Sequence, residues 1–167
     1  MPNNQDDKDQ VFDTIDPINQ VAAFHRCFQH PILPTPTIPA AARCELRIKL
    51  LQEELNELKE AIEQKDLVEI ADALCDIQYV LSGAVLEFGL GAKFKTLFEE
   101  VQRSNMSKAC RTKAEAEATV AHYKKEKRVD SYIKEVDGLF LVYRQGDDKT
   151  LKSIDYSPAD LVSILKD

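Results

Sequence analysis

The stretch LRIKLLQEELNELKEAI, residues 46–62, contains no proline or glycine and is rich in helix-forming residues, so it predicts a long helix. On an ideal helix, each residue advances by about 100°. Apolar side chains then fill about half of the circumference: Leu46, Leu50, Leu51, Leu58, Ala61 and Ile62. Glu54 and Glu57 fall inside this apolar arc and Glu53 lies at its edge, whereas Glu60 and Glu63 face solvent. The pattern therefore places carboxylates at the border of a core.

A second long helix is predicted from about Asp66, its N-cap, to Glu87. Its apolar stripe consists of Ile70, Ala73, Leu74, Ile77, Val80, Leu81 and Ala84. Glu69, Asp72 and Asp76 follow the border of that stripe at spacings of three and four residues. Because only about three residues connect the two helices, they are expected to pack antiparallel and to bring the two acidic faces together.

Converging carboxylates are costly, because partly buried like charges repel one another and lose hydration. Chance alone can produce such an acidic run in a protein with 29 Asp and Glu residues, as one half of ordinary helical ion pairs. A hard divalent cation accounts better for two facing clusters, since Mg²⁺, or Mn²⁺ in its place, prefers oxygen ligands. Magnesium shared with phosphate oxygens would point to a phosphorylated substrate.

The bulk composition limits the possible classes of function. The chain has 167 residues, 44% of them apolar, and a net charge of −7, which argues against binding of a nucleic acid polymer or an anionic membrane. The four cysteines show no metal-binding or disulfide spacing, and no export signal or membrane-spanning run is present. We therefore expect a cytoplasmic protein with reduced thiols.

Other segments complete the expected architecture, an all-α antiparallel helical bundle with a small C-terminal β-hairpin and a short helix. Residues 1–16 are expected to be frayed, 17–130 to form the helical domain, and 131–167 to pack on that domain as an appendage. The shorter helices are expected from Pro17, over about 93–105, and over 113–127 with Thr112 as N-cap. Asp137-Gly138 predicts the hairpin turn, and Ser157 and Pro158 predict the start of the last helix.

Several sequence motifs resemble those of one superfamily. EELNE, residues 53–57, followed by EIAD, residues 69–72, resembles the EExxE…ExxD signature of the all-α nucleoside triphosphate pyrophosphohydrolases, which include MazG, the dimeric dUTPases and phosphoribosyl-ATP pyrophosphohydrolase. The segments FHRCFQHP (24–31), VEIADALCDIQYVLSGAVLEFGL (68–90) and FEEVQRSNMSK (98–108) agree with a MazG-like branch. The resemblance covers about residues 20–108, and the region after Lys108 matches no motif of the superfamily.

The resemblance implies Mg²⁺-dependent hydrolysis of a nucleoside triphosphate, or a related nucleotide, to the monophosphate and pyrophosphate. We expect a homodimer, because two short helical pairs alone would expose too much apolar surface. The implied metal ligands are Glu54, Glu57, Glu69, Asp72 and Asp76, with the choice between Asp72 and Asp76 as main ligand of the second helix left open. Glu53 would orient or deprotonate the attacking water, and Asn105 and Lys108 would contact the substrate. Two alternatives remain: phosphoribosyl-ATP hydrolysis, and a non-catalytic helical scaffold or regulatory dimer with a structural metal site.

Overall fold

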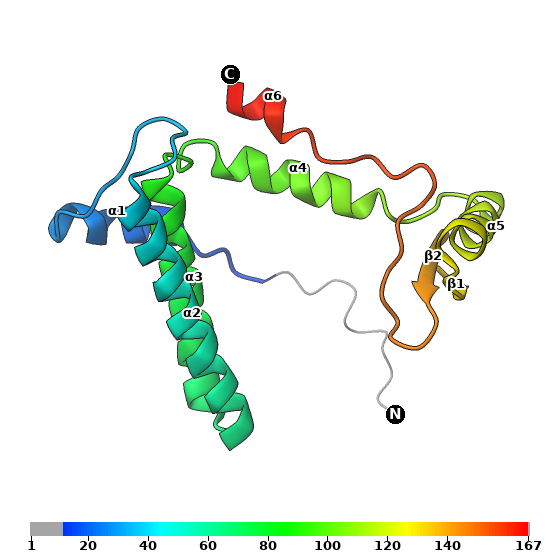
Figure 1. Cartoon of the computed structure of the whole chain (residues 1–167), viewed down its shortest axis with the longest axis horizontal. Helices are drawn as coiled ribbons and strands as arrows, with labels where there is room; N and C mark the ends of the chain where they lie inside the picture. The colour runs from blue at the N-terminus through cyan, green and yellow to red at the C-terminus, as the bar shows by residue number, and fades with distance from the viewer. Residues whose placement is uncertain (1–11, 167) are drawn as a thin grey trace. The chain divides into compact units, whose positions relative to one another are not determined.

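The computed structural model describes residues 12–166 and is mostly helical, which confirms the expected fold class (Figure 1). Its elements are α1 (Pro17–Cys27), α2 (Ala41–Gln64), α3 (Leu67–Glu87), α4 (Phe94–Met106), α5 (Lys113–His122), the π-helical turn η1 (Tyr123–Lys127), β1 (Ser131–Val136), β2 (Leu139–Arg144) and α6 (Leu161–Lys166). In this part of the chain, no helix is both long enough and apolar enough to cross a membrane.

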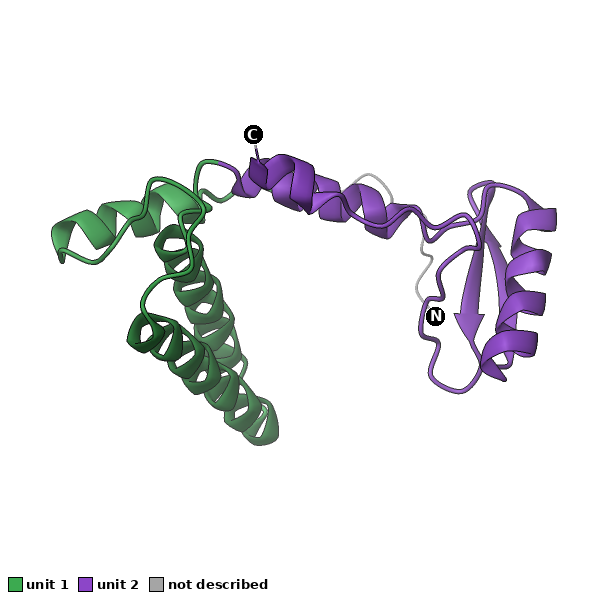
Figure 2. Cartoon of the chain, turned by 45° about the horizontal axis from the view of Figure 1, so that its top comes forward, with its two compact units in different colours: residues 1–92 green, residues 93–167 purple. Residues whose placement is uncertain are grey.

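The chain forms two compact units, residues 1–92 and residues 93–167 (Figure 2). Helices α1, α2 and α3 belong to the first unit, and α4, α5, the hairpin and α6 belong to the second. The domain division expected at residue 130 stays a prediction. Most of the frayed segment expected over residues 1–16 lies outside the described residues.

Helix caps begin three helices where the sequence predicts them. Asp66 begins α3, because its side chain accepts hydrogen bonds from the backbone N–H groups of Val68 (3.0 Å) and Glu69 (3.2 Å). Asp16 and Thr112 cap α1 and α5 in the same way. Lys65 has a left-handed φ of 59°, which ends α2 and reverses the chain into α3.

The proline-rich segment 31–39 lies along the C-terminal end of α3. The N–H of Leu33 donates to the carbonyl oxygen of Leu86, and the N–H of Thr37 donates to that of Phe88, both at 3.0 Å. Gly89 makes this close approach possible, since a Cβ at that position would lie 1.9 Å from the Thr35 carbonyl oxygen, and its φ is +66°.

A buried charge network joins α1, α2 and α3. Glu87 is 1% exposed and accepts hydrogen bonds from Arg43 and Arg47, including one from Arg43 Nε at 3.0 Å. Arg47 Nη2 lies 3.2 Å from His25 Nε2. An arginine can only donate, so Nε2 accepts, and His25 Nδ1–H donates to the Pro31 carbonyl oxygen at 2.9 Å. Burial lowers the pKa of His25, which keeps the ring neutral.

Gly83 leaves room for this network. A Cβ at Gly83 would lie 2.7 Å from Arg47 Nη1 and 3.1 Å from His25 Nε2. Burial alone would raise the pKa of Glu87, but the hydrogen bonds and charges of Arg43 and Arg47 outweigh it and lower that pKa. The carboxylate therefore stays ionised inside the unit.

The second unit has its own small core. Cys110, Ala116, Val142 and Leu151 are buried between α5 and the hairpin. β1 and β2 pair antiparallel, and the predicted turn is confirmed, because Asp137 and Gly138 both have positive φ values, 51° and 77°. The helix expected over 113–127 ends at His122 as an α-helix and continues as the π-helical turn η1.

The chain after Ser153 returns along α4. Ser107 Oγ accepts from the N–H of Ser157 at 3.0 Å, and Arg103 donates to Ser157 Oγ at 3.0 Å. Because Ser157 takes part in these hydrogen bonds, the predicted N-cap at Ser157 is wrong. The Asp160 side chain accepts a hydrogen bond from the Ser163 N–H at 3.2 Å instead, and α6 begins at Leu161. Arg103 and the Asp160 N–H hold the pKa of Glu100 at about 2.

We predict that Glu87→Gln lowers the free energy of unfolding by on the order of 3 kcal/mol, because Arg47 would keep a buried charge without a counter-charge. Since the pKa of Glu87 is lowered by folding, its contribution is complete above the ordinary pKa of a glutamate and is lost as pH falls. Urea unfolding of both proteins at pH 7 and pH 4 measures this.

The control is Glu117→Gln, which removes an exposed ion pair with Lys113. A loss as small as that of the control, or a difference between wild type and Glu87→Gln that does not shrink at pH 4, would contradict the assignment.

Candidate active site

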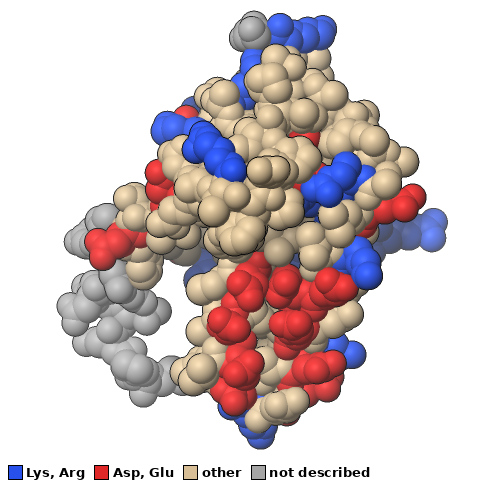
Figure 3. Space-filling model, turned by 90° about the vertical axis from the view of Figure 1, so that its left-hand side faces the viewer, with Lys and Arg blue, Asp and Glu red and all other residues tan. Residues whose placement is uncertain are grey.

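One face of the α2–α3 pair carries the predicted carboxylates, and acidic side chains gather in rows on it (Figure 3). Glu54 is half-buried and lies seven residues from both Arg47 and Ala61, which are buried toward α3. Glu57 is exposed, which corrects the expectation that it lies inside the apolar arc. The other predicted carboxylates are also exposed: Glu53, Glu69, Asp72 and Asp76. Only Glu54 is thus drawn toward the core.

The carboxylates of both helices act on Glu54. Its pKa is raised first by burial and then by the charges of Glu57, Asp76, Glu53 and Asp72. Asp76 has a larger effect than Asp72. The two acidic faces therefore meet across the helix pair, as the antiparallel connection requires.

The partner of Glu53 is a lysine of its own helix. Lys49 Nζ lies 3.8 Å from a Glu53 oxygen, in an exposed pair that contributes at most about 1 kcal/mol. Such a weak pair leaves Glu53 accessible at the rim of the acidic face.

A divalent cation fits the chemistry of this face. Its donors are carboxylate oxygens, which Mg²⁺ and Mn²⁺ prefer, and both burial and the charges of neighbouring carboxylates raise the pKa of Glu54. Among residues 12–166, no three His, Cys, Asp or Glu side chains are already gathered closely enough to hold a metal ion. The site consists of facing oxygen donors that would have to draw together around a cation.

A cavity of about 210 Å³ lies beside the acidic face. Leu50 and Tyr79 line it, and they lie one helical turn from Glu54 and Asp76, respectively. Aromatic rings form another part of its wall: Phe24 stacks on His30 with centroids 5.8 Å apart and meets Tyr79 edge-on at 5.6 Å. Arg43 and Arg47 also line it.

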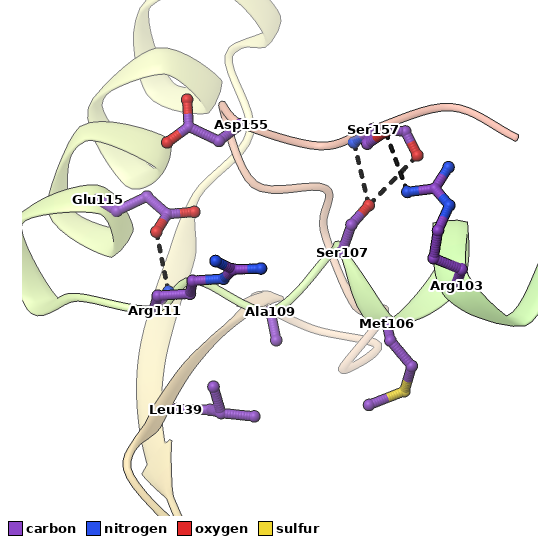
Figure 4. A pocket seen from close by; sticks show the side chains of 9 residues that line it. All are labelled: Arg103, Met106, Ser107, Ala109, Arg111, Glu115, Leu139, Asp155 and Ser157. Atoms are coloured by element: carbon purple, nitrogen blue, oxygen red, sulfur yellow. Dashed lines mark hydrogen bonds between the residues drawn. The ribbon is translucent and has the colours of Figure 1, made fainter.

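Asn105 and Lys108, the expected substrate contacts, belong to the second unit. Lys108 Nζ donates to Asn105 Oδ1 at 2.8 Å. Nearby, a cavity of about 670 Å³ opens between the end of α4, the start of α5 and the returning chain (Figure 4). Arg111, Asp155 and the apolar side chains of Met106 and Leu139 line this cavity.

Exposed apolar side chains follow the other side of the α2–α3 pair in two rows with seven-residue spacing: Ile48, Leu55 and Ile62 on α2, and Leu67, Leu74 and Leu81 on α3. Leu55 is two residues from both Glu53 and Glu57, so it points away from them. Leu74 has the same relation to Asp72 and Asp76. We call these two rows the apolar seam.

Sequence reasoning missed the network around Glu87 and the aromatic cavity. A weak indication was present, because Glu87 is an isolated charge in the otherwise apolar stretch SGAVLEFGL, residues 82–90. Its partners, Arg43 and Arg47, lie about 40 residues away in the chain. Only the pairing of α2 with α3 identifies them.

Comparison with known proteins agrees with the motifs. The chain is similar to an uncharacterized protein of Acanthamoeba polyphaga mimivirus, L479, with 36% identity over 67 residues. These residues are 40% of this chain and 27% of that protein. The chain therefore matches only about a quarter of that relative's length. The sequence profile of the phosphoribosyl-ATP pyrophosphohydrolase family matches residues 21–105, which include α2, α3 and the carboxylates. That match spans half of the chain, and the chain therefore belongs to the phosphoribosyl-ATP pyrophosphohydrolase family.

Proposed function

We propose that the protein hydrolyses a nucleoside triphosphate to the monophosphate and pyrophosphate with Mg²⁺. Membership in a family of pyrophosphohydrolases gives the class of reaction. The observation that carries the proposal is the face on which carboxylates of two helices gather around Glu54, whose pKa is raised by its burial and by their charges. A face with this much uncompensated charge repels a nucleotide unless a cation is present, and a cation shared with phosphate oxygens removes that repulsion.

Roles for the individual residues follow from their positions. Glu54, Glu57, Asp72 and Asp76 would hold the cation, with Glu69 at the outer end of the same face. When bound, a hard divalent cation neutralises phosphate oxygens and polarises water. Glu53, exposed at the rim, would accept the proton of the water whose oxygen bonds to phosphorus, while the bond to the pyrophosphate oxygen breaks.

The substrate's base and phosphates require separate contacts. The aromatic cavity is one turn from Glu54 and Asp76, so it would hold the base while the phosphates lie at the acidic face. Asn105 and Lys108 would contact the substrate as well, and the positive charge of Lys108 suits a phosphate.

A second candidate substrate is phosphoribosyl-ATP, which the name of the matching family favours. It carries the same triphosphate chain, so the acidic face would serve both reactions. A non-catalytic scaffold or regulatory protein that keeps the face as a structural metal site is the remaining alternative, and it differs by releasing no pyrophosphate. The cytoplasmic location stays a prediction.

We further propose that the protein is a homodimer that buries the apolar seam. Six large apolar side chains along one side of a helix pair are more than an isolated helical surface usually exposes. Their seven-residue spacing suits packing against the same two helices of a second copy.

We predict that Glu57→Gln reduces the rate of pyrophosphate release by on the order of 100-fold, because a neutral amide replaces a charged carboxylate among the proposed metal ligands of the acidic face. The assay uses Mg²⁺ and a panel of canonical and modified nucleoside triphosphates together with phosphoribosyl-ATP. Glu63→Gln is the matched control, since Glu63 is exposed on the same helix but, nine residues from Glu54, points away from that side chain. No release from any nucleotide by the wild type, or equal rates in both variants, would refute the proposal.

We predict that Glu54→Gln stabilises the metal-free protein, because the raised pKa of Glu54 means that its ionised form opposes folding. Mg²⁺ should raise the thermal unfolding midpoint of the wild type and of Glu63→Gln, but not that of Glu54→Gln. A Mg²⁺-dependent shift in Glu54→Gln equal to that of the wild type would exclude Glu54 as a ligand.

We predict that Leu74→Asp or Leu55→Asp converts a dimer to a monomer, because either change places a charge in the apolar seam. Each side chain is 52% exposed in the single chain, so the fold should tolerate the change. Sedimentation velocity measures the mass, with Val162→Asp on α6 as a control of similar exposure. A monomeric wild type, or a dimer that survives both changes, would disprove this interface.

A further inference from the structure

The two units differ in charge. Residues 1–92 contain seven Lys and Arg against 16 Asp and Glu, a net charge of −9, whereas residues 93–167 contain 15 against 13, a net charge of +2. Most of the positive charge of the protein therefore belongs to the second unit, most of which lies beyond the segment that the family profile matches.

Five cationic side chains of the second unit surround one pocket of about 390 Å³: Lys108, Lys127, Arg144, Lys149 and Lys152. We call it the basic pocket. Among the described residues, no acidic side chain lines it, and the ring of Tyr123 forms part of its wall. Lys108 follows the end of α4, Lys127 belongs to η1, and the other three belong to β2 and the chain directly after it. Three segments distant in sequence thus bring cations to one place.

Backbone hydrogen bonds hold these segments. The chain after β2 runs back along that strand, because the N–H of Arg144 donates to the Lys149 carbonyl oxygen at 2.9 Å and the N–H of Leu151 donates to that of Val142 at 2.8 Å. The N–H of Lys152 donates to the Tyr123 hydroxyl at 3.2 Å, and the N–H of Val129 donates to the Tyr123 carbonyl oxygen at 3.2 Å. Tyr123 therefore links both sides of the pocket. These hydrogen bonds fix the backbone that carries the cationic side chains.

Most of this charge is not neutralised. Arg144 is paired with Asp147 through two hydrogen bonds. Lys108 donates to the neutral amide of Asn105, and Lys152 Nζ lies 4.3 Å from the centre of the Tyr156 ring. Among the ion pairs of residues 12–166, none joins a carboxylate to Lys108, Lys127, Lys149 or Lys152, although the charge of Lys149 also acts on Asp147. Four cations without an ion-pair partner around one pocket repel one another unless an anion joins them.

We propose that the basic pocket binds the triphosphate chain of a nucleotide. The number of free cations suits the charge of such a chain, and the pocket is confined rather than drawn out into the stripe that a nucleic acid polymer would need. The strongly negative first unit would also repel a long polyanion. The pocket contains none of the residues of the acidic face, and Lys108 is the one residue it shares with the proposed substrate contacts. Binding of a triphosphate chain there does not require the hydrolysis proposed above.

The triphosphate chain would belong to a second nucleotide that is not hydrolysed, because the phosphates of the substrate are assigned to the acidic face. Such a site would give the region after residue 108 a role in nucleotide binding. Kinetics tests this assignment, because only capture of the substrate would raise KM when the pocket is changed.

The test measures binding of inorganic triphosphate to the full-length protein by isothermal titration calorimetry in EDTA, so that neither a metal ion nor turnover is needed. The Lys127→Gln/Lys149→Gln double variant should weaken binding by about tenfold or more. The control is Lys125→Gln/Lys134→Gln, which removes the same charge from the same unit outside the pocket and should leave the affinity unchanged within twofold. Circular dichroism confirms that both variants are folded.

No binding of triphosphate by the wild type, or equal losses in the two double variants, would overturn the proposal. Tighter binding of a single-stranded oligonucleotide, lost in Lys127→Gln/Lys149→Gln, would overturn it in favour of a nucleic acid site. In assays of Lys127→Gln/Lys149→Gln with Mg²⁺ and a nucleoside triphosphate, a KM equal to that of the wild type supports a second nucleotide. A raised KM at unchanged kcat would overturn that assignment in favour of capture of the substrate. If the wild type binds triphosphate but releases no pyrophosphate, the proposed binding site is supported and the proposed hydrolysis is refuted.

Discussion

The buried carboxylate of Glu87, held by Arg43 and Arg47, is the interaction on which the first unit depends. It joins the end of α3 to the start of α2, and through His25 it extends to α1. In an antiparallel pair, fixing one end also fixes which residues face each other several turns away. The register that pairs Arg47 with Glu87 therefore brings the carboxylates of α3 within electrostatic reach of Glu54. A buried ion group of this kind contributes more to a unique register than to net stability.

The α2–α3 pair meets opposite requirements on its two sides. One side keeps carboxylates accessible, and the other exposes leucine and isoleucine at heptad spacing. Because residues two apart on a helix point in nearly opposite directions, Glu53 and Glu57 lie on one side of α2 and Leu55 lies on the other. The proposed metal binding and the proposed self-association would therefore use different side chains of the same five residues and would not compete.

Much of the local structure, such as helix starts and the hairpin turn, could be predicted from the sequence. Caps at Asp66 and Thr112, the start of α1 at Pro17 and the turn at Asp137-Gly138 depend on residues close in the chain, and they were confirmed. Ionic partners far apart in sequence were not predictable, because helical periodicity gives the direction of a side chain but not what lies across from it. Ile62 illustrates the limit: it continues the apolar arc, yet it is 56% exposed in the single chain. The last helix starts later than predicted because Arg103 and Ser107 bind the residue that would have capped it. The roles of the carboxylates, of Asn105 and of Lys108 stay predictions.

The hydrogen bonds between Ser107 and Ser157 have a consequence for the evolution of this chain. They bring together the two points where α5 and the hairpin leave α4 and return to it. A segment whose ends already meet can be lengthened, shortened or exchanged at little cost in loop-closure entropy. The returning chain would still dock on α4 through Arg103 and Glu100. Relatives can therefore differ widely between these two serines while α4 and its partner segment remain the same.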